Sequence, residues 1–178
     1  MDQTIRRAQL AAFLFTAAAG TLLHFAYDAF PDFPVTAAIS SVNESVWEHM
    51  KLLYFPMLAA ALTQRIIFGA QRPHFWCIKL IGIVTGLLLI PAIFYLYTGA
   101  LGIHSTWIDI SIFYVAAAAV YLLETHLFMH ESSLTCRFPR TAMLLCIALA
   151  FLFLLFTYFP PHLPIFLDPV TSTYGLSK

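Results

Sequence analysis

Side chains able to do acid–base or metal chemistry are densest in one stretch, SVNESVWEHMKLLYFP at residues 41–56. On a helix, Glu44 and Glu48 fall on one face because they are four residues apart. Ser45 and His49 share the same spacing and fall on the neighbouring sector. Two carboxylates, an imidazole and a hydroxyl would then converge. Such a set can transfer protons in catalysis or bind a metal ion.

The same stretch also fits a purely structural role. Ser41 and Glu44 have the spacing of a capping box, S-x-x-E, which closes the first turn of a helix. Helix ends at a membrane surface are commonly polar without any catalytic role. This alternative therefore stays open for each polar residue of the stretch.

A second group of polar residues lies at the end of the first apolar segment. Gly20, His24 and Asp28 are spaced four residues apart and share a helix face. Imidazole and carboxylate groups are ligands that zinc accepts. With His49, they indicate a site for a divalent metal such as zinc, although the sequence does not identify the cofactor.

The sequence thus assigns three sets of residues to one candidate site. The predicted catalytic residues are Glu48, His49, Glu44 and Ser45; the predicted metal ligands are His24, Asp28 and His49; the residues predicted to orient them are Asn43, Lys51, Asp109 and Asp168. If the site is an enzyme's, Glu48 or Glu44 acts as general base.

Composition fixes the class of protein that must position these residues. The chain is 61% hydrophobic and 10% charged, with a mean hydropathy of +0.82. Apolar runs of about 20 residues are long enough to cross the ~30 Å of a bilayer's hydrocarbon. We therefore predict an all-α integral membrane protein with a single transmembrane domain, residues 1–178. Its five predicted spans are residues 8–27, 44–68, 76–97, 107–128 and 141–159, followed by a tail at 160–178.

Positive charges predict the orientation of these spans. Seven basic residues flank the spans on the side of the N-terminus: Arg6, Arg7, Arg65, Arg72, Lys79, Arg137 and Arg140. Only Lys51 and Lys178 fall on the other side. The positive-inside rule then places the N-terminus inside, the C-terminus outside and the candidate site on the extracytoplasmic face of the cell membrane. A net charge of zero offers no basic surface for nucleic acid.

The tail and the cysteines complete the sequence-based expectations. Four prolines exclude a sixth span from residues 160–178, and the apolar Ile165–Leu167 indicates that the tail folds back over the site. The three cysteines lack CxxC spacing and an even count. We read them as packing residues without a disulfide framework.

A second histidine pair, His126 and His130, lies near the inner end of the fourth span. Together with Ser45 and His49 it resembles the zinc-binding serine and histidines of the alkaline ceramidase and adiponectin receptor superfamily. The predicted topology argues against that assembly, because it puts the two pairs on opposite sides of the membrane. That superfamily also has seven spans. We expect His126 and His130 to be interfacial side chains.

Three segments carry a resemblance that spans nearly the whole chain. They are NESVWEHMKLLYFP, HFAYD in the first span and PPHLPIFLDPVTSTYG in the tail. The chain resembles a family of small bacterial multispan membrane proteins of unknown function, most specifically through the pattern NES-x-W-E-H-x-K. The resemblance implies a bacterial membrane protein and no particular activity.

Three classes of function are compatible with the sequence. The first is a membrane-embedded hydrolase or transferase, whose lipid or amphipathic substrate enters from the bilayer. The second is a protein that transports or senses a proton or metal ion. The third is an accessory subunit in which the polar cluster only caps a helix. The substrate and the oligomeric state are not determined by the sequence.

Overall fold

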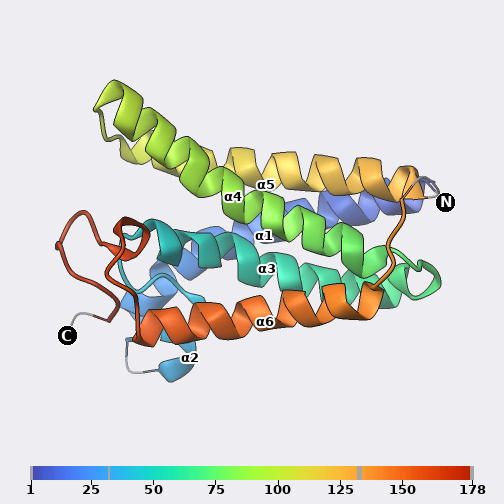
Figure 1. The fold of residues 1–178 in the computed structure, drawn as a ribbon, viewed down its shortest axis with the longest axis horizontal. Coiled ribbons are helices and arrows are strands. Elements are labelled where there is room, and N and C mark those ends of the chain that lie inside the picture. Colours follow the sequence, from blue (N-terminus) through green and yellow to red (C-terminus); the bar gives the residue numbers. More distant parts are fainter. Residues whose placement is uncertain (1, 32, 132–133, 177–178) are drawn as a thin grey trace.

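The computed structural model describes residues 2–31, 33–131 and 134–176, which fold into helices without a β-sheet and end in a mostly irregular tail (Figure 1). The five long helices are α1 (Asp2–Ala29), α3 (Val46–Ile67), α4 (Phe75–Leu101), α5 (Thr106–Met129) and α6 (Pro139–Tyr158). Three short elements connect or follow them: α2 (Pro34–Ile39), η1 (Gly69–Gln71) and η3 (Pro164–Phe166). The prediction of an all-helical protein is confirmed.

Consecutive long helices run in opposite directions, so the bundle has two distinct ends (Figure 1). α3 packs against α1, α4 and α6, and α5 packs against α1 and α4. We call the end with α2 and the chain after α6 the tail end. The opposite end, where α1 begins and α5 meets α6, is the basic end. α4 and α5 lean away from the other helices as they approach the tail end.

Four helices are long and apolar enough to cross a membrane: α1, α4, α5 and α6. α3 has a similar length, 22 residues, but carries Glu48, Lys51 and Arg65. These charges lower its hydropathy relative to the other four. Most of its side chains are buried among its neighbours, which is how a central helix can tolerate charged groups.

The first turn of α3 is capped four residues later than the sequence pattern suggested. The Ser45 hydroxyl accepts a hydrogen bond from the Glu48 backbone N–H at 3.4 Å, so Ser45 is the N-cap. The Asn43 side chain accepts from the Ser45 N–H at 2.9 Å. Ser41 and Glu44 therefore precede the helix and do not form its capping box. This leaves the Glu44 side chain free for other contacts.

A buried polar network joins four helices towards the basic end. The Lys79 ammonium lies 2.5 Å from the Glu124 carboxylate, and both side chains are at most 2% exposed. Gln9 of α1 donates to the same carboxylate at 3.1 Å and accepts from Gln64 of α3 at 2.7 Å. Gly82 of α4 leaves room for the carboxylate, because a Cβ there would collide with Glu124. The glycine thus serves the ion pair as well as helix packing.

Two of the three cysteines do not behave as the sequence suggested. Cys77 of α4 and Cys136, in the connection before α6, form a disulfide, with their Cα atoms 6.3 Å apart. Cys146 is free and buried, as expected of a packing residue. The sequence spacing concealed the pair because the connection between α5 and α6 folds back onto the start of α4. The prediction of no disulfide is therefore wrong.

Candidate metal site

Two histidines and a glutamate converge at the tail end of the bundle. His24 lies near the end of α1, Glu44 in the connection before α3, and His49 in the first turns of α3. One ligand atom from each residue lies within 4.8 Å of the others. The imidazole centroids of His24 and His49 are 5.2 Å apart. The structure therefore brings together residues that the sequence placed in the metal set and the catalytic set.

The hydrogen bonds of His49 determine which ring nitrogen is available. Its Nδ1 lies 2.9 Å from the backbone carbonyl of Ser45, and a carbonyl can only accept, so Nδ1 carries the proton. Nε2 then faces the Glu44 carboxylate at 3.4 Å. A neutral imidazole in this tautomer presents a lone pair toward the carboxylate. A cation between them would bind both groups.

His24 is held in the same way. Its Nδ1 lies 3.2 Å from the Ser41 hydroxyl, while that hydroxyl donates to the His24 backbone carbonyl at 3.4 Å. If the hydroxyl hydrogen goes to the carbonyl, the hydroxyl oxygen accepts from Nδ1. The Nε2 atom of His24 is then the free ligand atom. Metal-binding histidines are commonly oriented by such a bond from the other ring nitrogen.

The distances suit a small divalent metal ion. Ligand atoms at ~2.0–2.1 Å from a tetrahedral zinc lie ~3.3 Å from one another. The pair formed by His49 and Glu44 already has this separation, 3.4 Å. The side chains of His49 and Glu44 are 32% and 50% exposed, so the cluster is open to solvent on one side. Two histidines and one glutamate, with a position left open, are the ligand set of many catalytic zinc sites.

Asp28 lies beside this cluster, one turn beyond His24 on α1. Its side chain is exposed, and its charge acts on His24. Within the described part of the chain it forms no hydrogen bond or ion pair. Glu44, which the sequence assigned to catalysis, occupies the position of third ligand beside the two histidines. Asp28 remains a charged neighbour of the site.

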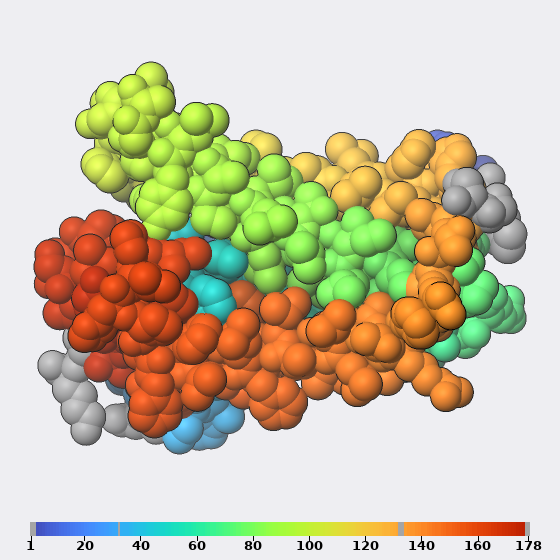
Figure 2. Space-filling model, viewed as in Figure 1, coloured from blue at the N-terminus to red at the C-terminus, as the bar shows by residue number. Residues whose placement is uncertain are grey.

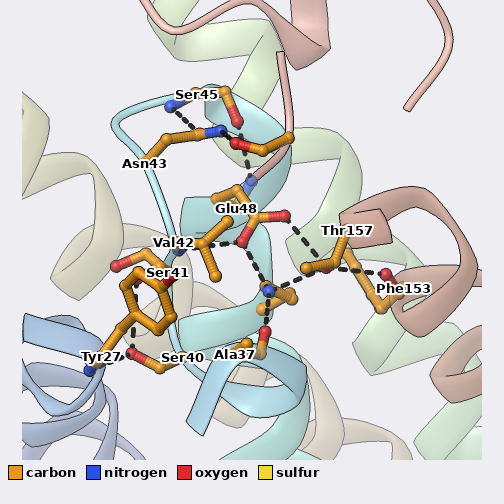
Figure 3. Close-up of polar contacts among 12 residues, drawn as sticks. Tyr27, Ala37, Ser40, Ser41, Val42, Asn43, Ser45, Glu48, Phe153 and Thr157 are labelled. Atoms are coloured by element: carbon orange, nitrogen blue, oxygen red, sulfur yellow. Dashed lines mark hydrogen bonds and ion pairs between the residues drawn. The ribbon is translucent and has the colours of Figure 1, made fainter. Parts of the chain in front are cut away.

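Glu48 points into the protein, towards Val42 and Thr157 (Figure 3). One carboxylate oxygen lies 2.5 Å from the Lys51 ammonium and accepts from the Val42 N–H at 3.1 Å. The other accepts from the Thr157 hydroxyl at 3.1 Å. The residue is 2% exposed. Because both of its oxygens are occupied, Glu48 is poorly placed to act as a general base. It instead holds Val42, Lys51 and Thr157 in position.

Lys51 completes a junction between three helices. Its ammonium donates to the Ala37 carbonyl of α2 at 3.0 Å and to the Thr157 hydroxyl of α6 at 2.9 Å. Together with Glu48 of α3, these contacts fix the connection between α2 and α3 (Figure 3). That connection carries Ser41 and Glu44. The ion pair therefore positions one metal ligand and the residue that orients His24.

The other residues predicted to orient the site are dispersed. Asn43 donates to the Gly175 carbonyl at 2.9 Å and so connects the tail to the start of α3. Asp109 accepts from the Tyr97 hydroxyl at 2.5 Å, which joins α4 to α5. Asp168 accepts from Val170 and Thr171, within its own turn of the tail. None of these hydrogen bonds reaches a histidine of the cluster.

The tail folds back onto the bundle and covers the first turn of α3. Phe166 packs against Trp47 with ring centroids 4.8 Å apart, and Leu167 forms an isolated bridge with Tyr174. Figure 2 shows the tail over this end, with only a narrow part of α3 visible between it and α4. The tail therefore lies on the Trp47 side of α3.

Two serines contribute to the site that sequence reasoning did not single out. Ser40 donates to the Leu23 carbonyl and accepts from the Tyr27 N–H at 3.2 Å, so it attaches the connection to the end of α1. Ser41, considered only as a helix cap, orients His24. The sequence feature that could have indicated this role is the pair of adjacent serines, whose hydroxyls can form hydrogen bonds with backbone groups at a helix end.

The second histidine pair lies at the basic end. The rings of His126 and His130 are 4.4 Å apart on the last turns of α5, at the opposite end of the bundle from His49. The assembly with Ser45 and His49 that resembled a zinc hydrolase superfamily is therefore not formed.

Gly20 lies one turn before His24 on α1. Phe113 and the Leu52 carbonyl pack closely against this glycine, where a Cβ would collide with them.

Fold and site together define an all-helical protein with four helices able to cross a membrane and a histidine–carboxylate cluster at one end. The chain belongs to the family of unknown function DUF6512, whose profile matches residues 6–176. This confirms the expected membership of a family without a known function. A search of curated proteins and a search of solved structures found no significant match. The bacterial origin and the NES-x-W-E-H-x-K pattern remain predictions.

Proposed function

We propose that the protein is a metal-dependent membrane enzyme, a hydrolase or transferase that acts on a lipid or another amphipathic substrate. His24, His49 and Glu44 would hold the metal, most simply zinc. The observation that carries the proposal is the convergence of these three ligands, with Nδ1 of each imidazole engaged by the chain. Imidazoles oriented in this way are typical of metal ligation through Nε2, whereas histidines at a solvated helix end need no such orientation.

The reaction class follows from what such a metal supplies. Bound zinc polarises a carbonyl or phosphoryl oxygen and makes a bound water a nucleophile near neutral pH. The protein's own residues would orient the ligands: the Ser45 carbonyl holds His49, and Ser41 holds His24. Glu48 would hold the connection that carries Ser41 and Glu44 in place, through its contacts with the Val42 N–H and Lys51.

The proposal includes five membrane crossings, with α3 as the fifth. Two considerations support this. α3 lies among the four apolar helices with its charges at its two ends, and the seven basic residues all lie at the basic end. The basic end would then face the cytoplasm and the metal site would face outward.

Transport of an ion through the bundle is the main alternative. Gly20 lies one turn before His24 on α1, and Phe113 and the Leu52 carbonyl lie so close to it that a Cβ there would collide with them, which leaves little room for a polar path. A polar pair does occur further in, where the Thr16 and Tyr121 hydroxyls are 2.7 Å apart. Along α1, the close packing of Phe113 at Gly20 lies between Thr16 of that pair and His24. We therefore favour a site that is reached from one side.

Metal content tests the proposed site directly. The wild-type protein, purified in detergent and dialysed against zinc at low concentration, should retain about one zinc ion per chain. His24→Ala, His49→Ala and Glu44→Gln should each lower zinc affinity at least ~100-fold, because two remaining ligands do not hold the ion in place. The measurement is elemental analysis together with competition by a chelator.

His126→Ala is the matched control, because it removes a surface imidazole at the basic end. It should leave the stoichiometry unchanged. Wild-type protein without stoichiometric metal would contradict the enzyme proposal and return the cluster to a structural role. Equal zinc loss in the control would show that the ion binds elsewhere.

Accessibility labelling tests the orientation. A membrane-impermeant maleimide applied to intact cells should label a cysteine placed at Val35 or Val170, both exposed at the tail end. It should not label one placed at Phe138, which is exposed at the basic end, until the cells are opened. These variants are made in a chain whose three native cysteines are replaced by serine. The reverse pattern would invert the proposed topology.

A further inference from the structure

Charge is distributed unevenly around the candidate metal site. Among the described residues, the carboxylates at the tail end are Asp28, Glu44, Glu48, Asp109 and Asp168. The one Lys or Arg at that end in the same part of the chain is Lys51, which is fully buried against Glu48. Of these five, Asp28 and Glu44 are exposed, so within the described residues the surface beside the site carries carboxylates and no ammonium or guanidinium group for the phosphate or carboxylate of an anionic head group.

Asp28 carries the charge that the proposed metal does not neutralise. Glu44 would be a metal ligand, whereas Asp28 lies four residues beyond His24, ~6 Å further along the helix axis. Its side chain is exposed, and within the described residues it has no hydrogen-bond or ion-pair partner. A carboxylate without such a partner thus lies one helical turn beyond His24, close enough for its charge to act on that imidazole.

Phe25 adds an aromatic surface next to this carboxylate. It is 60% exposed, and its ring contacts the His24 ring edge-on at a centroid distance of 5.0 Å. Phe25 and Asp28 are three residues apart, so they are neighbours on the surface of α1. An aromatic face beside a carboxylate is the combination that favours an ammonium or quaternary ammonium group.

We propose that the substrate is a cationic amphiphile, with an amine or quaternary ammonium group bound by Asp28 and Phe25, about one helical turn along α1 from His24. This inference rests on the proposed function and adds the substrate class to it. The Asp28 carboxylate attracts a cationic head group and repels an anionic one, so both effects increase the difference in affinity between them. Together they should separate the two head groups by about tenfold or more in affinity.

The test uses the protein loaded with Co²⁺, whose absorption spectrum reports ligands at the metal. Three hydroxamate amphiphiles share one alkyl chain and carry a trimethylammonium, a neutral hydroxyl or a sulfonate group ~6 Å from the hydroxamate. Binding is titrated in a neutral detergent at low salt. The Kd should be lowest for the ammonium compound and at least about tenfold higher for the sulfonate compound.

Variants identify the residues responsible. Asp28→Asn should reduce the preference between ammonium and sulfonate to less than about threefold and leave the Kd of the neutral compound unchanged. Phe25→Leu should weaken the ammonium compound alone. Glu131→Gln is the control for net charge, because it removes a carboxylate at the basic end that is paired with Arg72. It should leave the preference intact.

The two proposals fail in different ways. A protein that takes up no Co²⁺ overturns the proposed function, and the substrate class falls with it. Normal Co²⁺ loading with equal affinity for all three compounds, or tighter binding of the sulfonate, overturns the substrate class alone. A preference that survives in Asp28→Asn also overturns the role of that residue.

Discussion

Glu48→Gln should destabilise the folded protein by about 3–5 kcal/mol, even though glutamine has nearly the same shape. The Lys51 ammonium is 0% exposed and lies 2.5 Å from the Glu48 carboxylate. With a neutral partner, its charge would have only the Ala37 carbonyl and the Thr157 hydroxyl as close partners. A buried charge without its counter-ion is one of the largest costs that a single substitution can cause.

A denaturant titration of the protein in detergent measures the free energy of unfolding and so tests this effect. The double variant Glu48→Leu/Lys51→Met should recover most of the lost stability, because it removes both charges together. Glu44→Gln is the matched control at an exposed carboxylate and should change stability by less than about 1 kcal/mol while abolishing metal binding. Equal stability of Glu48→Gln and wild type would refute the buried ion pair.

Lys79→Met should have an effect of similar size, about 3–5 kcal/mol, at the other polar centre. It leaves the Glu124 carboxylate fully buried, with the Gln9 amide as its remaining hydrogen-bond donor. If the bundle spans a membrane as proposed, water is not available there to replace the missing charge. Phe75, Tyr121 and Phe128, whose rings surround the ammonium, would lose their cation contacts as well.

Thermal unfolding in detergent tests this second prediction, with Lys79→Met/Glu124→Gln as the rescue variant. The double substitution should recover part of the loss, since glutamine can still accept from Gln9. Zinc affinity provides an independent readout, because this network lies towards the opposite end of the bundle from the histidines. A large loss of zinc affinity in folded Lys79→Met would contradict the separation of the two polar centres.

Helical periodicity was sufficient to predict the helices and part of the site. The second predicted span, 44–68, corresponds to Val46–Ile67, because apolar runs and polar ends mark helices clearly. The meeting of His24 with His49 was also predictable. Both residues lie near the same boundary of adjacent antiparallel spans, so a short connection brings them together.

The direction of each neighbouring side chain was not predictable. Glu48 and His49 differ by about 100° around the helix, and sequence alone does not say which direction faces the metal. The deciding partner, Thr157, is 109 residues away from Glu48. The same limitation concealed the pairing of Cys77 with Cys136, which are 59 residues apart. Contacts between distant segments depend on how the helices pack.

The positions of the ligands also set the order in which the site is assembled during synthesis. His24, Glu44 and His49 all lie in the first two long helices and the connection between them, so the ribosome delivers the complete set of candidate ligands once this hairpin has been synthesised. The tail residue that bonds to Asn43, Gly175, is synthesised 132 residues later. If the proposed metal binds, a nascent chain could thus acquire it before the tail packs over the start of α3.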